Sequence, residues 1–305
     1  MNNILITGGT GFIGQSIISE LMSSNGANTI TSLSRDWVKT EAAKRRHNWV
    51  NFFCGDIRDT ALLNRIIKEN KIDKIIHAAA LKSITTASEN PIECKSINVD
   101  GTISLLNAAQ NNDVRKTVLI SSDKAANPLT FYGQTKSMME QIGMAYNRVC
   151  ICRYGNVVGS TGSVLPYFIS LIKNGQNVLP ITNINMTRFW FSRHAATSFV
   201  LDVLQNMPEG IYIPKLKSAT LRVFFLALHD IFNEISWKTV DLSRGYEKIH
   251  ETMVSNNEEP NKVTDLVYSI GSGKKNTTEF DSEFAEKFTV NELKQQIETY
   301  LRTCN

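Results

Sequence analysis

The sequence contains no long hydrophobic run. None of its apolar stretches approaches the ~20 residues that cross a bilayer as a helix, which argues against a helical membrane protein. The first residues, MNNILI, lack the basic region and the small-residue cleavage site of a secretory signal peptide. We therefore expect a cytoplasmic protein that does not insert into a membrane.

Cysteine, histidine clusters and charge of one sign are also scarce. The 305 residues include five cysteines without a Cys-x-x-Cys pair, and an odd number cannot all form disulfides, so we expect reduced thiols. Cys150 and Cys152 alternate on one expected strand, which predicts buried thiols on a shared face. The five histidines show no spacing typical of a metal site, and none is proposed. The formal net charge of +4 is spread along the chain and gives no indication of a nucleic acid partner.

Short β-rich runs alternate with helical patterns through the first half of the chain. The expected strands are residues 4–7, 29–33, 50–54, 74–78, 117–121 and 149–153. The helices expected between them include residues 13–22, 91–111 and 132–146. Near-continuous apolar strands separated by crossover helices are typical of a parallel sheet covered on both faces. The sequence therefore predicts an α/β fold, a doubly wound Rossmann-type parallel sheet.

The pattern becomes less regular after residue 154, which predicts a smaller α+β substrate lobe. We expect a helix at 164–172, a strand at 178–182, a buried core strand around residues 189–191, and a last helix at 293–301 opened by a capping box. The predicted division assigns residues 1–155, with parts of 176–205, to the cofactor domain. Residues 156–305 then form mainly the substrate-binding lobe, and the two are expected to interleave.

The glycine-rich string TGGTGFIG at residues 7–14 follows the first expected strand and opens the first helix. Its glycines at 8, 11 and 14 permit a tight turn, close approach of backbone to a pyrophosphate, and close packing of helix on sheet. This context predicts dinucleotide binding.

The end of the second strand bears on which dinucleotide is bound. Ser34 and Arg35, supported by Lys39, suit the 2′-phosphate of NADP, whereas the Asp36 carboxylate suits the ribose hydroxyl of NAD. Arg35 is alternatively a solvated residue at a helix start. We favour NADP. Asp56 and Ile57, at the end of the third strand, are expected beside the adenine.

Tyr132 and Lys136 form a Tyr-x-x-x-Lys pair, whose spacing places both on one helix face. A phenol with a pKa near ~10 is a poor base until a cation favours the phenolate. Together with Ser121 and Ser122 on the preceding strand end, the pair resembles the active-site signature of the extended short-chain dehydrogenase/reductase superfamily.

Longer strings resemble the UDP-N-acetylglucosamine 4,6-dehydratases, in particular the inverting enzymes of pseudaminic acid synthesis, within a polysaccharide biosynthesis family. The similarity covers about residues 4–253. Its strings are HAAALK (77–82), NPIEC (90–94), SDKAANP (122–128), YGQTK (132–136), RYGNVVGS (153–160), GSVLP (162–166), IT (181–182), MTRFW (186–190) and EKIHE (247–251).

The resemblance implies a reaction that removes water from C5 and C6 of a hexose. Oxidation of the C4 hydroxyl makes the C5 hydrogen acidic, with Tyr132 as the base at O4 and NADP as the hydride acceptor. Lys124 is then the C5 base and Asp123 the acid at O6 or its partner. Ser122 binds the C4 oxygen and Lys136 orients the nicotinamide ribose. For this role we expect burial or a neighbouring cation to lower the pKa of Lys124.

The expected ligand contacts combine the motif residues with those implied by the resemblance. On the cofactor side they are Thr7, Gly8, Thr10, Gly11, Phe12, Ile13, Gly14, Ser34, Arg35, Lys39, Asp56, Ile57, Ala78, Ala79, Ala80, Asn98, Ser121, Tyr132, Lys136 and Val157. On the substrate side they are Lys82, Ser122, Lys124, Tyr132, Asn156, Ser163, Val164, Thr182, Arg188, Arg244 and Glu247.

Several alternatives remain open on the sequence. The same intermediate serves a C5-retaining 4,6-dehydratase, a 5,6-dehydratase and a nucleotide-sugar epimerase, and Asp123-Lys124 is alternatively a plain surface turn. A non-enzymatic NADP-binding protein is the remaining class. The family resemblance also implies a homo-oligomer, a dimer or hexamer.

Overall fold

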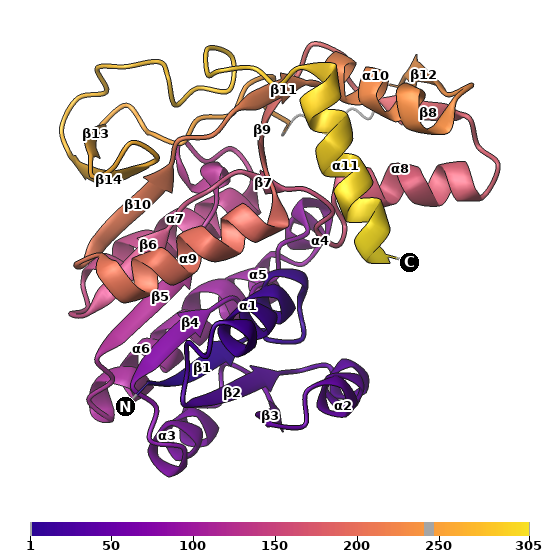
Figure 1. Ribbon diagram of the computed structural model, residues 1–305. Coiled ribbons are helices and arrows are strands. Elements are labelled where there is room, and N and C mark those ends of the chain that lie inside the picture. The colour runs from indigo at the N-terminus through magenta and orange to yellow at the C-terminus, as the bar shows by residue number, and fades with distance from the viewer. Residues whose placement is uncertain (1, 241–246, 305) are drawn as a thin grey trace.

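The computed structural model describes residues 2–240 and 247–304. Its centre is a nine-stranded sheet with helices on both faces, and a smaller lobe lies beyond one end of the strands (Figure 1). The spatial order of the strands is β3-β2-β1-β4-β5-β6-β10-β14-β13. The parallel strands are β1 (Asn3–Thr7), β2 (Thr29–Ser34), β3 (Val50–Cys54), β4 (Lys74–His77), β5 (Lys116–Ile120), β6 (Val149–Cys152) and β10 (Gly210–Pro214). The predicted doubly wound fold is confirmed.

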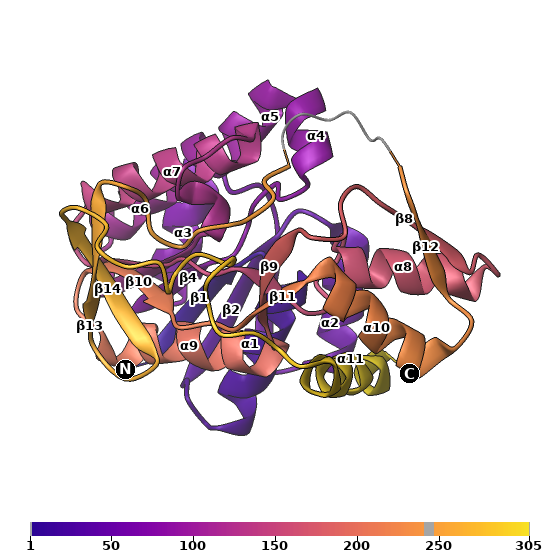
Figure 2. The ribbon, with the colours of Figure 1, turned by 90° about the horizontal axis from the view of Figure 1, so that it is seen from above.

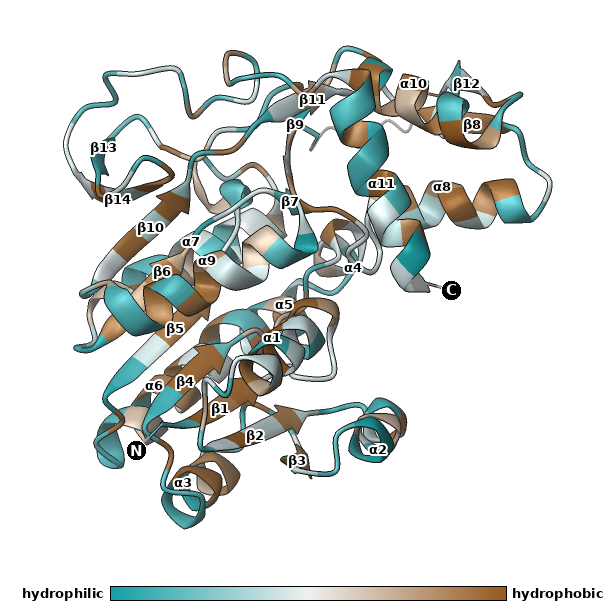
Figure 3. Ribbon diagram, viewed as in Figure 1, coloured by the Kyte–Doolittle hydropathy of each residue, from teal (hydrophilic) through white to brown (hydrophobic). Residues whose placement is uncertain are grey.

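Side chains alternate between the two faces of this sheet, and each face has its own helical layer (Figure 2). Ile4 and Ile6 of β1 pack on one face, and Leu5 packs on the other. Figure 3 shows the helices turning apolar sides toward the strands. The first layer is α1 (Phe12–Ser23), α2 (Trp37–Arg46) and α9 (Arg193–Asn206). The second is α3 (Thr60–Glu69), α6 (Gly101–Asn111) and α7 (Phe131–Met144).

One expected helix contains a local change of pitch. Residues 91–111 are continuously helical, as predicted, but α5 (Pro91–Lys95) and α6 are joined by a π-helical turn, η1 (Ser96–Asp100). Such turns occur often at functional sites. The short helix α4 (Ile84–Glu89) precedes them and was not expected.

The smaller lobe is built around its own aromatic core. Trp190 stacks on Phe224 with ring centroids 4.9 Å apart, and residues 189–191 are buried as expected. Thr289 and Glu292 exchange backbone-to-side-chain hydrogen bonds, which confirms the capping box. The elements are β7 (Asn156–Val157), α8 (Val164–Lys173), β8 (Val178–Ile181), β9 (Thr187–Phe191), β11 (Ser218–Thr220), α10 (Leu221–Phe232), β12 (Ser236–Thr239) and α11 (Val290–Cys304).

The main sheet extends past the predicted division of the chain. β10 pairs in parallel with β6, and β14 (Val267–Ser272) and β13 (Glu258–Lys262) follow it antiparallel. Residues expected in the substrate lobe therefore complete the cofactor sheet, whereas α9, which packs on that sheet, falls almost wholly within the range 176–205 that was partly assigned to the cofactor domain. Cys150 and Cys152 are buried on one face, as predicted. No helix of the described ranges is both long and apolar enough to cross a bilayer.

Candidate active site

The carboxyl ends of the parallel strands bring most of the expected residues to one edge of the sheet. Thr7 ends β1 and Ser34 ends β2, while the segments after β4, β5 and β6 carry the alanines, Ser122 and Asn156. β1 and β4 are neighbours although β2 and β3 follow β1 in sequence. Ligands of doubly wound folds bind at this kind of switch point.

The glycine-rich loop is shaped so that only glycine fits at two positions. Gly8 has φ +71°, and a Cβ there would lie 2.8 Å from the backbone nitrogen of Ala79. A Cβ on Gly14 would lie 2.4 Å from the Gly8 carbonyl oxygen. The loop is thus pressed against Ala78–Ala79 and leads directly into the N-terminus of α1. A dinucleotide pyrophosphate fits this cradle of bare backbone.

Charged groups at the ends of β2 and β3 lie where the sequence places the adenosine end of the cofactor. Within the part of the chain that the structure describes, Arg35 makes only long ion pairs, 3.8 Å to Asp56 and 3.5 Å to Glu93. Arg58, which the sequence analysis missed, binds Asp56 and Glu93 at 2.7 and 2.9 Å. The basic residue type two positions after Asp56 was the sequence feature that could have indicated a partner for this carboxylate.

Other residues of this region have structural partners of their own. The Asp36 carboxylate caps α2 by accepting from the Lys39 backbone N–H at 3.0 Å, and the exposed Lys39 ammonium pairs with it at 3.2 Å. The Ser34 hydroxyl accepts a hydrogen bond from the Thr10 N–H at 3.2 Å. Ile57 is a core side chain packed beside Gly101. The structure therefore employs Asp36 as a helix cap, a role that the NAD alternative did not include.

Asn98, in the π-helical turn, lies behind the loop that follows β4. It is buried and accepts from the Leu81 N–H at 2.8 Å, while its amide group donates to Leu81 O and Thr135 Oγ1, each at 3.0 Å. Because its amide group already has these partners, Asn98 fixes the backbone of Leu81 in the loop after β4. Val157 and Ser121 are also buried, and the Ser121 hydroxyl donates to Glu140 at 2.5 Å.

Tyr132 and Lys136 both lie buried on α7, one helical turn apart. Lys136 Nζ donates to the Ile120 carbonyl oxygen at 2.7 Å, and burial lowers the pKa of Lys136 to about 8. Burial raises the pKa of Tyr132 to about 12, partly offset by the positive charge of Lys124 and the Ser122 hydroxyl. A Cβ on Gly133 would lie 2.5 Å from the Lys124 carbonyl oxygen, so α7 packs directly on the Asp123–Lys124 turn.

That turn is a single 3₁₀ helix, η2 (Asp123–Ala125), capped by Ser122. The Ser122 hydroxyl donates to Asp123 Oδ1 at 2.8 Å, and Lys124 Nζ donates to the same oxygen at 3.1 Å. Lys124 Nζ also lies 3.5 Å from Asn156 Oδ1. Asp123 is almost completely buried, so the turn points its charges into the molecule and is no solvated surface turn.

The pKa of Lys124 departs from the expectation that it is lowered. Burial does lower it, but the Asp123 and Glu251 carboxylates outweigh burial, and the pKa of Lys124 lies above its ordinary value. Burial raises the pKa of the Asp123 carboxyl. The expected lowering of the Lys124 pKa is therefore wrong, because two buried carboxylates beside the amine outweigh the effect of burial.

Glu251 is the second of these carboxylates, and the sequence analysis gave it no role. Its side chain is 5% exposed, with Oε1 3.4 Å from Lys124 Nζ. It comes from the EKIHE string at 247–251, which was the signal that could have identified it. The same string places Lys248 Nζ 3.1 Å from the Ala126 carbonyl oxygen.

Three of the residues expected on the substrate side, Arg188, Thr182 and Glu247, contact one another. Arg188 donates to Glu247 Oε1 at 2.9 Å, and Thr182 donates to Oε2 at 3.0 Å. Lys82 is exposed after β4, while Ser163 and Val164 lie at the start of α8. Arg244 lies outside the described residues.

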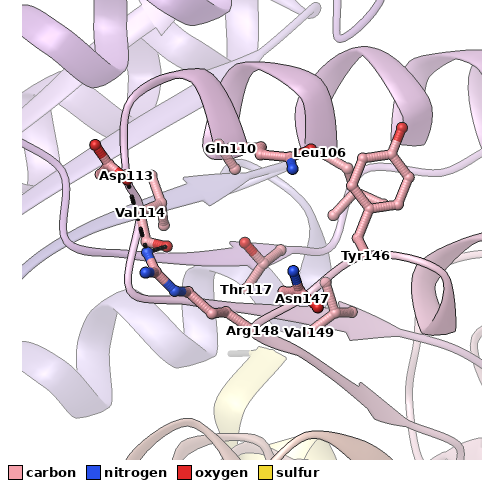
Figure 4. A pocket seen from close by; sticks show the side chains of 10 residues that line it. Leu106, Gln110, Asp113, Val114, Thr117, Tyr146, Asn147, Arg148 and Val149 are labelled. Atoms are coloured by element: carbon pink, nitrogen blue, oxygen red, sulfur yellow. Dashed lines mark hydrogen bonds and ion pairs between the residues drawn. The ribbon is translucent and has the colours of Figure 1, made fainter.

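The hollow drawn in Figure 4 lies at the opposite edge of the sheet. It opens beside the amino ends of β5 and β6, between α6 and the segment after α7, and Arg148 on its rim pairs with Asp113 at 4.0 Å. None of the expected site residues lines it. Across residues 2–240 and 247–304, no group of three or more His, Cys, Asp or Glu side chains could hold a metal ion.

The glycine cradle, Ser122 and the Tyr132–Lys136 pair on a doubly wound sheet define an enzyme of the extended short-chain dehydrogenase/reductase type. More narrowly, the chain belongs to the family described as polysaccharide biosynthesis protein, whose model matches residues 4–270. These findings confirm the predicted resemblance and the expectation of a hydro-lyase of the nucleotide-sugar dehydratase kind.

Two curated relatives illustrate the range of this similarity. The chain is 38% identical over 267 residues to UDP-N-acetylglucosamine 4,6-dehydratase (inverting) of Campylobacter jejuni strain 81-176, covering 84% of this chain and 78% of that protein. It is 36% identical over 277 residues to UDP-glucose 4-epimerase of Rickettsia rickettsii, covering 86% and 80%.

Solved structures share the whole architecture. Pen from Bacillus thuringiensis has a TM-score of 0.89 at 25% identity, covering 98% of both chains. A dTDP-glucose 4,6-dehydratase from Bacillus anthracis, solved in complex with NAD, has a TM-score of 0.70 at 19% identity, covering 99% of this chain and 97% of that one.

Proposed function

We propose that this protein catalyses the NADP-dependent dehydration of UDP-N-acetylglucosamine to a UDP-4-keto-6-deoxy-hexosamine, with inversion at C5. The product would serve surface polysaccharide or nonulosonic acid synthesis. The observation that carries the proposal is Lys124, whose amine lies 3.1 Å from the buried Asp123 carboxylate on the turn against which α7 packs. A simple epimerase or reductase needs Ser122, Tyr132 and Lys136 but no base at position 124.

The residues have complementary tasks in this reaction. NADP, when bound in the glycine cradle, supplies hydride acceptance at C4 and hydride return to C6. Tyr132 takes the proton of the O4 hydroxyl when it is a phenolate, a form that burial opposes and the positive charge of Lys124 favours, while Ser122 donates a hydrogen bond to that oxygen. Lys124 then removes the proton at C5, which the adjacent ketone has made acidic; because the pKa of Lys124 is raised, the step proceeds through the fraction of Lys124 that has lost its proton. Asp123 protonates O6, so that the C6–O6 bond breaks and water leaves. After hydride has been returned to C6, C5 regains a proton, and its arrival on the face opposite to the one that lost the proton gives inversion.

NADP is preferred over NAD in this proposal because of the basic groups at the end of β2. Arg35 is about half exposed and its ion pairs are long, so its guanidinium is able to bind a 2′-phosphate. Arg188 and Thr182, gathered by Glu247, are proposed to bind the nucleotide sugar, with Lys82, Asn156, Ser163 and Arg244. We also propose a homo-oligomer, which analytical ultracentrifugation would test.

The decisive experiment is incubation of the purified protein and NADP with UDP-N-acetylglucosamine, followed by mass spectrometry and proton NMR. Loss of one water with a new methyl doublet supports the proposal, and the C5 coupling constants report the configuration. Unchanged mass with an altered C4 signal would instead indicate epimerisation, the activity named for the Rickettsia relative. No change despite tight NADP binding would indicate a non-catalytic protein.

The substitution Lys124→Ala tests the residue itself. We expect product formation to fall by at least ~10²-fold, the usual contribution of a positioned general base, with NADP binding retained. Lys44→Ala is the matched control, because Lys44 is an exposed lysine on α2 paired with Glu41. Unchanged turnover by the Lys124 variant would overturn the assignment.

A further inference from the structure

Two buried carboxylates face one amine at the proposed site, and only Asp123 has a role so far. Glu251 Oε1 lies 3.4 Å from Lys124 Nζ, and Asp123 Oδ1 lies 3.1 Å from the same nitrogen. The second oxygens, Asp123 Oδ2 and Glu251 Oε2, are buried and accept no hydrogen bond from the described residues; Glu251 Oε2 has only a long ion pair, 3.7 Å to Lys248 Nζ, besides. Burying a carboxylate with one oxygen lacking a hydrogen bond is costly, so holding two such carboxylates against one amine points to a role beyond a structural ion pair.

Glu251 is held in place from several directions. Its backbone N–H donates to Ser282 Oγ at 2.8 Å, and Ser282 in turn bonds Thr187 of β9. Figure 2 shows the segment that starts at residue 247 running back from the α4 side toward β13 and β14. Glu251 therefore reaches Lys124 from the second half of the chain.

The surrounding charges keep Glu251 ionised. Burial raises the pKa of Glu251, but Lys124, Arg188 and Lys248 together lower it below its ordinary value. Asp123 faces Lys124 from the other side, and burial raises the pKa of Asp123. The two carboxyls thus differ in their tendency to carry a proton: Asp123 is the one suited to give a proton away, and Glu251 is the one suited to remain an anion.

We propose that Glu251 is a positioning residue of the reaction: its carboxylate orients the Lys124 amine and stabilises the ammonium that forms when Lys124 takes the C5 proton. In that step the C5–H bond breaks, an N–H bond forms on Lys124, and the electron pair of the C5–H bond passes into the enolate of the 4-ketone. Asp123 separately gives its proton to O6. This inference rests on the proposed function for the identity of the proton donor.

A negative charge this close to an amine makes it a stronger base and also keeps it protonated to a higher pH. Glu251→Gln removes the charge while keeping the size. We expect the acidic limb of the pH–rate profile of kcat/KM to move down by roughly 1–3 pH units, and the plateau rate to fall at least ~10-fold.

Two comparison variants separate this role from a structural one. Glu251→Asp keeps the charge, so the acidic limb of the pH–rate profile is expected to stay near its original pH. The plateau rate is expected to fall because the shorter side chain no longer aligns the amine. This variant is the test if Glu251→Gln does not fold. Glu283→Gln removes an exposed carboxylate that lies 3.8 Å from His250, and its profile is expected to match the unsubstituted protein. Glu251→Gln and Glu251→Asp profiles that both coincide with the original would overturn the proposal.

A second measurement does not depend on the identity of the substrate. Competitive labelling with acetic anhydride across a pH series, read by peptide mass spectrometry, reports the pH at which the Lys124 amine becomes reactive. We expect this pH to be lower in Glu251→Gln than in the unsubstituted protein. Absence of the shift refutes the role of Glu251, whereas the shift without dehydration of UDP-N-acetylglucosamine refutes only the proposed function.

Discussion

Arg153 and Glu140 form a doubly hydrogen-bonded ion pair inside the protein. Arg153 Nε lies 3.0 Å from Glu140 Oε1 and Nη2 lies 2.5 Å from Oε2, with both side chains at most 5% exposed. The same guanidinium binds Glu258 of β13 and the Met253 carbonyl oxygen. One side chain on the loop after β6 thereby connects α7 to the edge of the sheet that comes from the far end of the chain.

We expect Arg153→Met to lower the free energy of unfolding by about 3–5 kcal/mol, because it leaves two carboxylates buried without their cation. Urea denaturation followed by circular dichroism measures the loss. Lys44→Met breaks the exposed pair with Glu41 and is expected to change stability by less than ~1 kcal/mol. A loss of the same small size in the Arg153 variant would show that the buried network contributes little.

The buried, neutral His77 is expected to make the protein less stable at acid pH. It is completely buried between the Thr7 and Thr102 hydroxyls, at 2.7 and 3.1 Å, and burial lowers its pKa from 6.5 to about 3. In the unfolded chain His77 becomes protonated below pH 6.5, whereas in the folded protein it stays neutral down to about pH 3. The free energy of unfolding therefore decreases as the pH falls through this window. Within this window His77 lowers the free energy of unfolding by about 1.4 kcal/mol for each pH unit.

The measurement compares unfolding free energies between pH 6.5 and 5 for the unsubstituted protein and His77→Phe. The substituted protein should show a shallower loss, because position 77 no longer titrates. Parallel curves would contradict the assignment, whatever the absolute stability of the variant.

Gly8→Ala is expected to weaken NADP binding by roughly 10–100-fold, the equivalent of the 1–3 kcal/mol that a strained backbone costs. The new Cβ would press on the backbone of Ala79 and displace the cradle. Isothermal titration calorimetry measures the affinity. Gly175→Ala is the control: it shares a positive φ of +80° but meets no atom within 4 Å, so it should lower stability and leave NADP affinity intact.

Arg35→Ala tests the choice of cofactor. A lost charge-assisted hydrogen bond to the 2′-phosphate should raise the Kd for NADP by about 10–100-fold and leave the Kd for NAD nearly unchanged. Titration of both dinucleotides against both proteins gives the ratio. Equal weakening for NAD and NADP would place Arg35 outside the phosphate site.

Much of the cofactor half could be predicted because its signals are local. Alternation in Ile4-Leu5-Ile6, the glycines at 8 and 14, and the Tyr132–Lys136 spacing each report on neighbouring residues, and the structure arranges them as expected in strand, turn and helix. The strings around Lys124 and Glu247 were also informative, since they preserve the order of a known family.

The features of the fold and site that could not be predicted from the sequence depend on contacts between distant segments of the chain. β10, β14 and β13 give weak local patterns, and they belong to the sheet only because β10 pairs with β6, β14 with β10 and β13 with β14. The raised pKa of Lys124 depends on Asp123 and on Glu251, and no spacing in the sequence connects Glu251 to the SDK string. Arg58 was overlooked because an arginine after a strand is usually solvated, and only the structure shows it between Asp56 and Glu93.

The pairing of β6 with β10 has a consequence for truncation. All four residues of β6 are buried, and β10 covers the edge that faces away from β5. A fragment stopping at residue 155 would present that apolar edge with its backbone groups unpaired, which is a template for self-association. The first six strands are contiguous along the chain, yet such a fragment should accumulate as aggregates and not as an independent nucleotide-binding unit.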